Sequence, residues 1–245
     1  MRGDLSKMRI VIYSLITFGA LAISCHRSPT ESRQLLVIQT GNWTSPVGEA
    51  YRFIGSVGQW RPVGRSFPVS VGRSGLGWGI GEPSLQRTGE PIKREGDGRA
   101  PAGRFPLLEA FGRNLQPSQY PYLSLTTSSV CVDDPSAAQY NTFQEAGPQP
   151  RPWLSAEPLY DIDVYDLGVI VGYNTERPKP GRGSCVFLHR WETPHAATAG
   201  CTAMSASNLT ALLEWLDQTK KPIIVQLPRA QYERLRAPWR LPILP

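Results

Sequence analysis

The sequence lacks any internal repeat, any low-complexity block and any stripe of like charge. Its 26 lysine and arginine residues are scattered along 245 residues, and the net charge of +6 is mild. Nucleic acid is therefore disfavoured as the main partner, whereas an anionic polymer such as the cell wall stays open. Histidine and cysteine are scarce, with three and four residues, so the few that occur narrow the search for chemistry.

The composition is also unlike that of a helical bundle. Glycine and proline, with 23 residues each, indicate many turns. The apolar fraction of 40% is enough for a real core and argues against wholesale disorder. The length fits one good-sized domain with an appendage, or two small domains.

One apolar run begins close to the N-terminus. Residues 10–24 carry no charge and follow a positive start that contains Arg2, Lys7 and Arg9. Fifteen residues are too few for a comfortable membrane span and have the proportions of a secretory signal. We therefore expect residues 1–24 to be a signal peptide and the chain to be exported.

A cysteine stands where this run ends. Residues 22–25 resemble the lipobox of bacterial lipoproteins, although Ala22 replaces the usual Leu or Val. The resemblance implies a lipid anchor on Cys25, a tether over residues 25–33 and a place on the periplasmic side of the envelope. His26, where an Asp commonly retains such proteins in the inner membrane, favours the outer membrane. The alternative is an ordinary signal peptide that happens to contain a cysteine.

Short strands between turns dominate the rest of the chain. Runs rich in Val, Ile, Tyr and Phe occupy residues 35–40, 51–57, 66–72, 122–127, 167–173, 184–190 and 223–227. One stretch is helical, because leucines recur at helical spacing at positions 209, 212, 213 and 216. Ser207 is its candidate cap and residues 220–222 its candidate end. The tail, residues 232–245, fits no single element. We expect one mostly-β domain over residues 34–245 with a late α-helix.

Several aspartates lie close together in the sequence, but their spacing is not that of a calcium loop. They are Asp133, Asp134, Asp161, Asp163 and Asp166. We interpret them as solvated turns and predict neither a metal nor another cofactor.

The residues with the clearest chemical signal lie between positions 183 and 205. His189 ends a predicted strand, and Cys201 follows twelve residues later after Thr198 and Gly200. A cysteine nucleophile reacts as its thiolate, and a nearby imidazole is a common activator. A thiol at a Gly-Cys turn, close to backbone N–H groups, gains a lower pKa and an oxyanion site. The alternative is a buried structural cysteine beside a strand histidine.

This arrangement resembles the L,D-transpeptidase catalytic domain of the YkuD type. That family has a His at a strand end and then a Ser/Thr-x-Gly-Cys turn, matched here by His189 and residues 198–201. Residues 93–105 look like the family's segment with a proline, a glycine and a phenylalanine. Further similarity to an exported branch lies in residues 132–135, 140–141, 155–157 and 167–174. The resemblance implies a β-sandwich or β-barrel.

The resemblance implies roles for single residues. Cys201 is the acyl-accepting nucleophile and His189 the base, with a backbone carbonyl of Gly200 or Thr198 orienting the imidazole. The chain departs from the best-known branch by a shorter His-to-Cys spacing and by alanine at positions 199 and 203. It also lacks an arginine soon after the cysteine. Arg190 is the candidate substitute for that cation, and Thr198 and Arg190 are the predicted substrate-binding residues.

The resemblance implies an acyl-transfer reaction that serves cell wall biogenesis and thereby the shape of the cell. Cys201 would form a thioester with a peptidoglycan stem peptide and pass it to an amine. The alternatives are a cysteine hydrolase that uses water, such as a carboxypeptidase or amidase, and an inactive wall-binding lipoprotein. Papain-like enzymes place Cys before His, opposite to the order here. Sortases share the order but need a downstream arginine, and the nearest is Arg229. No pattern predicts an oligomeric state.

The two remaining cysteines predict a disulfide. If Cys25 is lipidated and Cys201 is reserved for catalysis, Cys131 and Cys185 are left in an oxidising compartment. Cys185 lies four residues before His189, roughly 13 Å along a strand, too far to be the activated thiol. The alternative is a pair of buried, reduced thiols.

Overall fold

The computed structural model describes residues 32–80, 86–114 and 120–244. The predicted signal peptide and Cys25 lie outside the described residues, as does most of the tether. No helix within the described ranges is long and apolar enough to cross a membrane.

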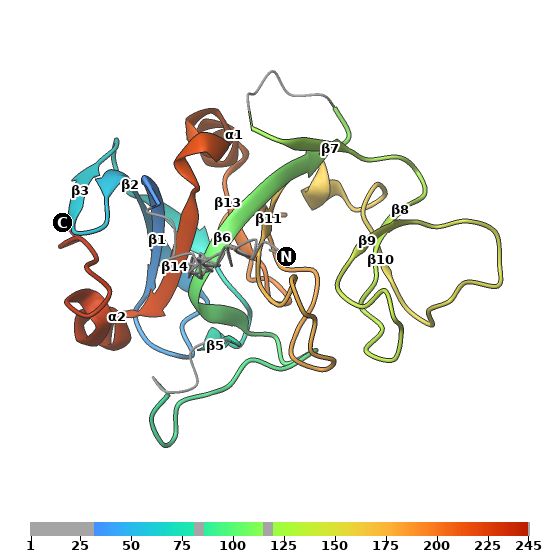
Figure 1. Cartoon of the computed structure of the whole chain (residues 1–245), viewed down its shortest axis with the longest axis horizontal. Coiled ribbons are helices and arrows are strands. Elements are labelled where there is room, and N and C mark those ends of the chain that lie inside the picture. Colours follow the sequence, from blue (N-terminus) through green and yellow to red (C-terminus); the bar gives the residue numbers. More distant parts are fainter. Residues whose placement is uncertain (1–31, 81–85, 115–119, 245) are drawn as a thin grey trace, which may run out of the picture.

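The main body is a β-sheet that closes on itself, which confirms the mostly-β prediction (Figure 1). Its strands run in the order β1-β14-β6-β11-β12-β13-β4-β2-β3, and β2 also pairs with β1. Because β2 pairs with both β1 and β4, the sheet forms a barrel. The bounds are β1 Gln34–Thr40, β2 Val47–Ser56, β3 Gln59–Pro62, β4 Phe67–Ser70, β5 Leu76–Trp78, β6 Ala100–Gly112, β7 Tyr122–Ser124, β11 Leu167–Val171, β12 Phe187–Arg190, β13 Thr202–Met204 and β14 Ile223–Pro228.

Aliphatic side chains fill the barrel and the layer under its helices. Strand β1 is buried along almost its whole length, because it pairs in parallel with β14 and is covered by a C-terminal helix. That helix, α2 (Arg229–Arg236), occupies part of the tail for which the sequence predicted no element. Helix α1 (Ala206–Trp215) packs against β11 and β12 through Leu209, Leu212 and Leu213.

The late helix is where the leucine spacing predicted it, but both of its predicted ends are wrong. Ser205, not Ser207, caps α1 by accepting a hydrogen bond from the backbone N–H of Asn208. The helix ends at Trp215, so Lys220 belongs to a separate 3-10 turn, η3 (Gln218–Lys220). A serine directly before the first helical residue can reach the free N–H groups of the first turn, whereas one inside that turn cannot.

The long central strand β6 was not predicted. It holds Pro101, Gly103 and Pro106, which disfavour a strand by propensity. Gly103 takes a φ of +144°, and a side chain there would meet the ring of Phe105 at 2.8 Å. Pairing with β5 and β14 along its first half and with β7 and β11 along its second half overrides the local preference.

A small second sheet lies beside the barrel, on the right of Figure 1. Its strands are β8 (Ser129–Cys131), β9 (Phe143–Glu145) and β10 (Glu157–Pro158). An aromatic cluster joins it to the barrel, because Phe143 contacts Phe111 and Phe187 edge-on at 5.5 Å. Three of the stretches that resemble the exported branch lie in the segment from β8 to β10, namely residues 132–135, 140–141 and 155–157.

Candidate active site

The two residues with the strongest sequence signal lie on neighbouring parallel strands. Strands β12 and β13 pair so that Leu188 is opposite Thr202 and His189 opposite Ala203. Cys201 directly precedes β13 and is therefore opposite Phe187. Because side chains alternate along a strand, His189 and Cys201 are diagonal neighbours on one face of the sheet. The short strand β13 separates Cys201 from helix α1.

The turn before the cysteine is held by one hydroxyl. Thr198 Oγ1 accepts a hydrogen bond from the backbone N–H of Gly200 at 3.1 Å and donates one to the carbonyl of Cys201 at 2.7 Å. Thr198 also pairs through its backbone with Val71 and Arg73. A side chain at position 200 would press on the carbonyl oxygen of Arg99 at 3.1 Å. Glycine is therefore needed for close packing.

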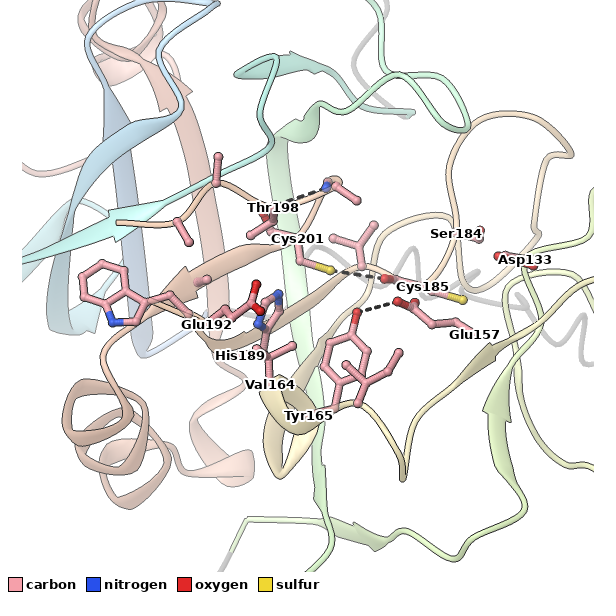
Figure 2. Close-up of a pocket in the computed structure, with 18 of the residues that line it drawn as sticks. Asp133, Glu157, Val164, Tyr165, Ser184, Cys185, His189, Glu192, Thr198 and Cys201 are labelled. Carbon is pink, nitrogen blue, oxygen red and sulfur yellow. Dashed lines mark hydrogen bonds between the residues drawn. The ribbon is translucent and has the colours of Figure 1, made fainter. Parts of the chain in front are cut away.

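Both side chains open into one pocket of about 480 Å³ (Figure 2). The barrel supplies His189, Cys201 and the 196–200 turn, which includes Thr198. Across the pocket lie Asp133 and Glu157 from the small sheet, together with Val164 and Tyr165 from the 3-10 turn before β11.

His189 is held as a neutral imidazole. It is 6% exposed, and burial lowers its pKa from 6.5 to about 4. Nδ1 lies 2.7 Å from the carbonyl oxygen of Arg190 and must donate to it, because a carbonyl can only accept. This leaves Nε2 unprotonated at neutral pH and able to take a proton. The orienting carbonyl is therefore that of Arg190, and the prediction of Gly200 or Thr198 for this role is wrong.

The Cys201 thiol is protonated at rest. Its pKa is raised to about 12, first by burial and next by the charge of Glu157. The backbone N–H of Phe187, 3.3 Å from Sγ, and the charge of Lys93 act in the opposite direction but do not prevail. The thiol donates to the carbonyl of Cys185 at 3.4 Å. From the sequence we expected the Gly-Cys turn to lower the pKa of the thiol. The structure shows the opposite shift, because a thiolate in this buried position loses its hydration.

Tyr165 and Glu157 complete the surroundings of the thiol, and the sequence pattern predicted neither as a site residue. Tyr165, in the 3-10 turn η2 (Asp163–Tyr165), donates from its hydroxyl to Glu157 Oε1 at 2.8 Å. Its ring meets the ring of His189 edge-on at 5.2 Å. Burial raises the pKa of the Glu157 carboxyl. Position 157 lies in a stretch that resembles the exported branch, which was the available signal.

A buried lysine also lines the pocket. Lys93 is 4% exposed, and its Nζ donates to Asp97 Oδ1 at 2.8 Å and to the carbonyl of Arg94 at 2.6 Å. The pocket is also lined by carboxylates, namely Glu95, Asp133, Glu157 and Glu192. Since Asp97 already pairs with Lys93, negative charge predominates around the thiol.

Arg190 is not part of this pocket. It follows His189 on β12, so its side chain points to the other face of the strand. There it forms an ion pair with Asp166 at 3.0 Å and donates to the carbonyl of Asp163 at 2.7 Å. The prediction of Arg190 as a substrate-binding cation is therefore wrong.

The aspartates are not all solvated, contrary to the expectation. Asp134 is buried and accepts hydrogen bonds from the backbone N–H groups of Ser136 and Leu154, which fixes a loop of the small sheet. Asp163 and Asp166 pair with arginines. Within the described residues, no group of His, Cys, Asp and Glu could hold a metal ion.

The structure joins Cys131 and Cys185 in a disulfide, with their Cα atoms 6.0 Å apart. Cys131 ends β8, and Cys185 precedes β12 with a φ of +52°. The predicted strand over residues 184–190 therefore begins later than expected, because β12 starts only at Phe187. The bridge links the small sheet to the strand that carries His189, and among the described cysteines only Cys201 is free.

Comparison with known proteins assigns the family. A profile of the L,D-transpeptidase catalytic domain, YkuD, matches residues 52–225. The match covers well over half of the chain, so the chain belongs to the L,D-transpeptidase catalytic domain (YkuD) family. A comparison with curated proteins found no match.

Among solved structures, the helical cell shape determining protein Pgp2 from Campylobacter jejuni is similar over 80% of this chain. The identity is 14% and the TM-score 0.36. The chain spans 48% of the length of that protein.

Proposed function

We propose that this chain is an exported cysteine acyltransferase that acts on the stem peptides of peptidoglycan. The observation that carries the proposal is the placing of Cys201 and His189 on one face of neighbouring strands, open to one pocket, in a YkuD domain. An inactive wall-binding protein has no need of a thiol beside an imidazole whose Nε2 is free to accept a proton.

The first half of the reaction is acylation. His189 Nε2 accepts the thiol proton while Cys201 Sγ attacks the carbonyl carbon of a stem-peptide bond. The C–N bond then breaks, the imidazolium returns the proton to the leaving amine, and the acyl group stays on sulfur as a thioester. Because the resting pair is neutral, proton transfer accompanies the attack rather than preceding it.

The second half resolves the thioester. An amine of another stem peptide attacks the acyl carbon and loses its proton to His189. The C–S bond breaks, and the imidazolium passes that proton to the departing sulfur, which leaves as a thiol. The product is a new amide cross-link. Water in place of the amine gives a carboxylate and makes the chain a hydrolase.

The test is incubation of the protein with purified wall fragments, followed by mass spectrometry. We expect a cross-linked or trimmed fragment from the wild type and none from Cys201→Ala or His189→Ala. Alanine fits at position 201 without a clash, since it removes one buried atom. A carbapenem should add its mass to the wild-type tryptic peptide over residues 191–220 and not to Cys201→Ala. Turnover by Cys201→Ala would reject the proposal.

The location follows from the N-terminal sequence and is part of the proposal. A lipid on Cys25 holds the domain at the periplasmic side of the envelope, near its polymeric substrate. Wild-type protein made in bacteria should enter the detergent phase, and Cys25→Ser should enter the aqueous phase or remain unprocessed. Wild-type protein in the aqueous phase would contradict the anchor.

A further inference from the structure

Tyr165 contacts both reactive side chains of the site at once. Its ring lies edge-to-face with that of His189, with the ring centroids 5.2 Å apart, and it packs in the same buried cluster and lines the same pocket as Cys201. The same hydroxyl donates to Glu157 Oε1 at 2.8 Å. Figure 2 shows the Tyr165 hydroxyl between the Glu157 carboxylate and the sulfur atom. The acyl-transfer steps above use neither Tyr165 nor Glu157.

The groups that face Glu157 are mainly negative. Asp133 from the loop after β8 and Glu95 from the loop before β6 both oppose its ionisation. Lys93 is the cation of this pocket, and Asp97 already takes its Nζ. Within the described part of the chain, none of the ion pairs includes Glu157. The ionised carboxylate is therefore stabilised mainly by the hydrogen bond that it accepts from the Tyr165 hydroxyl.

The tyrosine hydroxyl has one proton to give. While Glu157 is ionised, Tyr165 donates to the carboxylate and has no proton left for sulfur, and the Cys201 thiol donates to the carbonyl of Cys185. When Glu157 is protonated, the carboxylic acid donates to the tyrosine oxygen. The tyrosine O–H can then donate to a Cys201 thiolate. A thiol with a carboxylate and a thiolate with a carboxylic acid hold the same number of protons, so one converts into the other without loss or gain.

We propose that Tyr165 and Glu157 share a proton with Cys201 and thereby set the reactivity of the nucleophile. Ionised Glu157 keeps the thiol in its protonated, unreactive form. A neutral group at position 157 releases it. The link to turnover rests on the proposed acyl transfer, but the effect on the thiol does not.

The proposal makes a specific statement about pH. Below the titration of Glu157, the thiolate fraction rises tenfold for each pH unit. Once Glu157 ionises, the thiolate with its carboxylic acid partner becomes a fixed fraction, so thiol reactivity stays flat with pH. Reactivity rises again only at higher pH, where the thiol loses its proton beside a charged carboxylate. The two pH values at which the slope changes are therefore apparent pKa values of the coupled Glu157–Cys201 pair and belong to neither group alone.

The experiment measures the rate of alkylation of Cys201 by iodoacetamide in the full chain, from about pH 5 to about pH 10. The label is counted on the tryptic peptide over residues 191–220, which carries Cys201 and no other cysteine. The wild type should show a rise, a flat section and a second rise. Glu157→Gln keeps an acceptor for the tyrosine hydroxyl but carries no charge. It should rise steadily and, at the upper end of the flat section, react about tenfold faster.

Two further variants separate the proposal from a structural effect. Tyr165→Phe removes the shared hydroxyl and should narrow the flat section. Glu214→Gln removes a carboxylate from the exposed face of α1 and should follow the wild-type curve. Unfolding midpoints show whether each variant is folded before its curve is compared.

Either of two results with Glu157→Gln would overturn the proposal. One is a Glu157→Gln curve that overlays the wild type, and the other is a Glu157→Gln variant that reacts more slowly at every pH. If the three-part curve is found but wall fragments are not processed, the proposed function fails and the proton sharing stands. If wall fragments are processed and the curve has no flat section, only the proton sharing fails.

Discussion

The barrel and the small sheet beside it are stabilised in different ways. The barrel has strands of up to 13 residues and one continuous cluster of buried side chains. The small sheet has strands of two or three residues, anchored by a disulfide and by carboxylates such as Glu145, which accepts from three hydroxyls. The barrel carries Cys201 and His189, the proposed nucleophile and base, and the small sheet carries Glu157, whose charge opposes thiolate formation. The barrel thus provides most of the buried core, whereas the small sheet influences the pKa of the Cys201 thiol.

The largest test of this comparison is removal of the disulfide. Its sulfur atoms close a loop between residues 54 positions apart, for which chain entropy predicts about 4 kcal/mol of stabilisation. We expect Cys131→Ala with Cys185→Ala to lower the free energy of unfolding by about that amount in urea titration. Reduced wild type should match the double variant. If oxidised wild type, reduced wild type and the double variant all unfold at the same urea concentration, the disulfide does not stabilise the small sheet.

The second test concerns the barrel. Leu212 of α1 is fully buried, so Leu212→Ala should cost about 3 kcal/mol through lost burial and the cavity left behind. Leu154, in a loop of the small sheet, is 93% exposed, and Leu154→Ala is the matched control with a change within about 0.5 kcal/mol. If the two variants have the same stability, the barrel is not where the fold is stabilised.

The smallest test is at the boundary between the two parts. His189 has a folded pKa of about 4 against an ordinary 6.5. Below pH 6.5 the unfolded chain therefore takes up a proton that the folded chain refuses. The contribution to stability is full above pH 6.5, falls through this window and is gone below pH 4.

At pH 5 the loss amounts to about 2 kcal/mol relative to neutral pH. His189→Gln should remove this part of the pH dependence in urea titrations at several pH values. His195→Gln, at an exposed position, should retain it. The same slope in His189→Gln and wild type would show that the imidazole is not buried neutral.

Sequence reasoning predicted the barrel strands better than the surroundings of the thiol. Val, Ile and Leu runs such as that of β1 and β14 bury themselves wherever they pair, so local pattern is enough to find them. Cys201 and His189 were found because residue type and chain order carry the signal. Tyr165 and Glu157 were missed because their role arises from contact between β10, η2 and the barrel. Arg190 was wrongly predicted because the alternation of side chains after His189, which turns it to the other face of the strand, was not applied to it.

The strand β6 has a consequence for how this chain can vary in length. Its first half is paired with β5 and β14, and its second half with β7 and β11. Losing or gaining one residue within it would turn every side chain beyond that point to the opposite face. The loops around the small sheet have no such restriction. Related chains should therefore differ in loop length on the side of the pocket formed by the small sheet, while residues 100–112 keep their count.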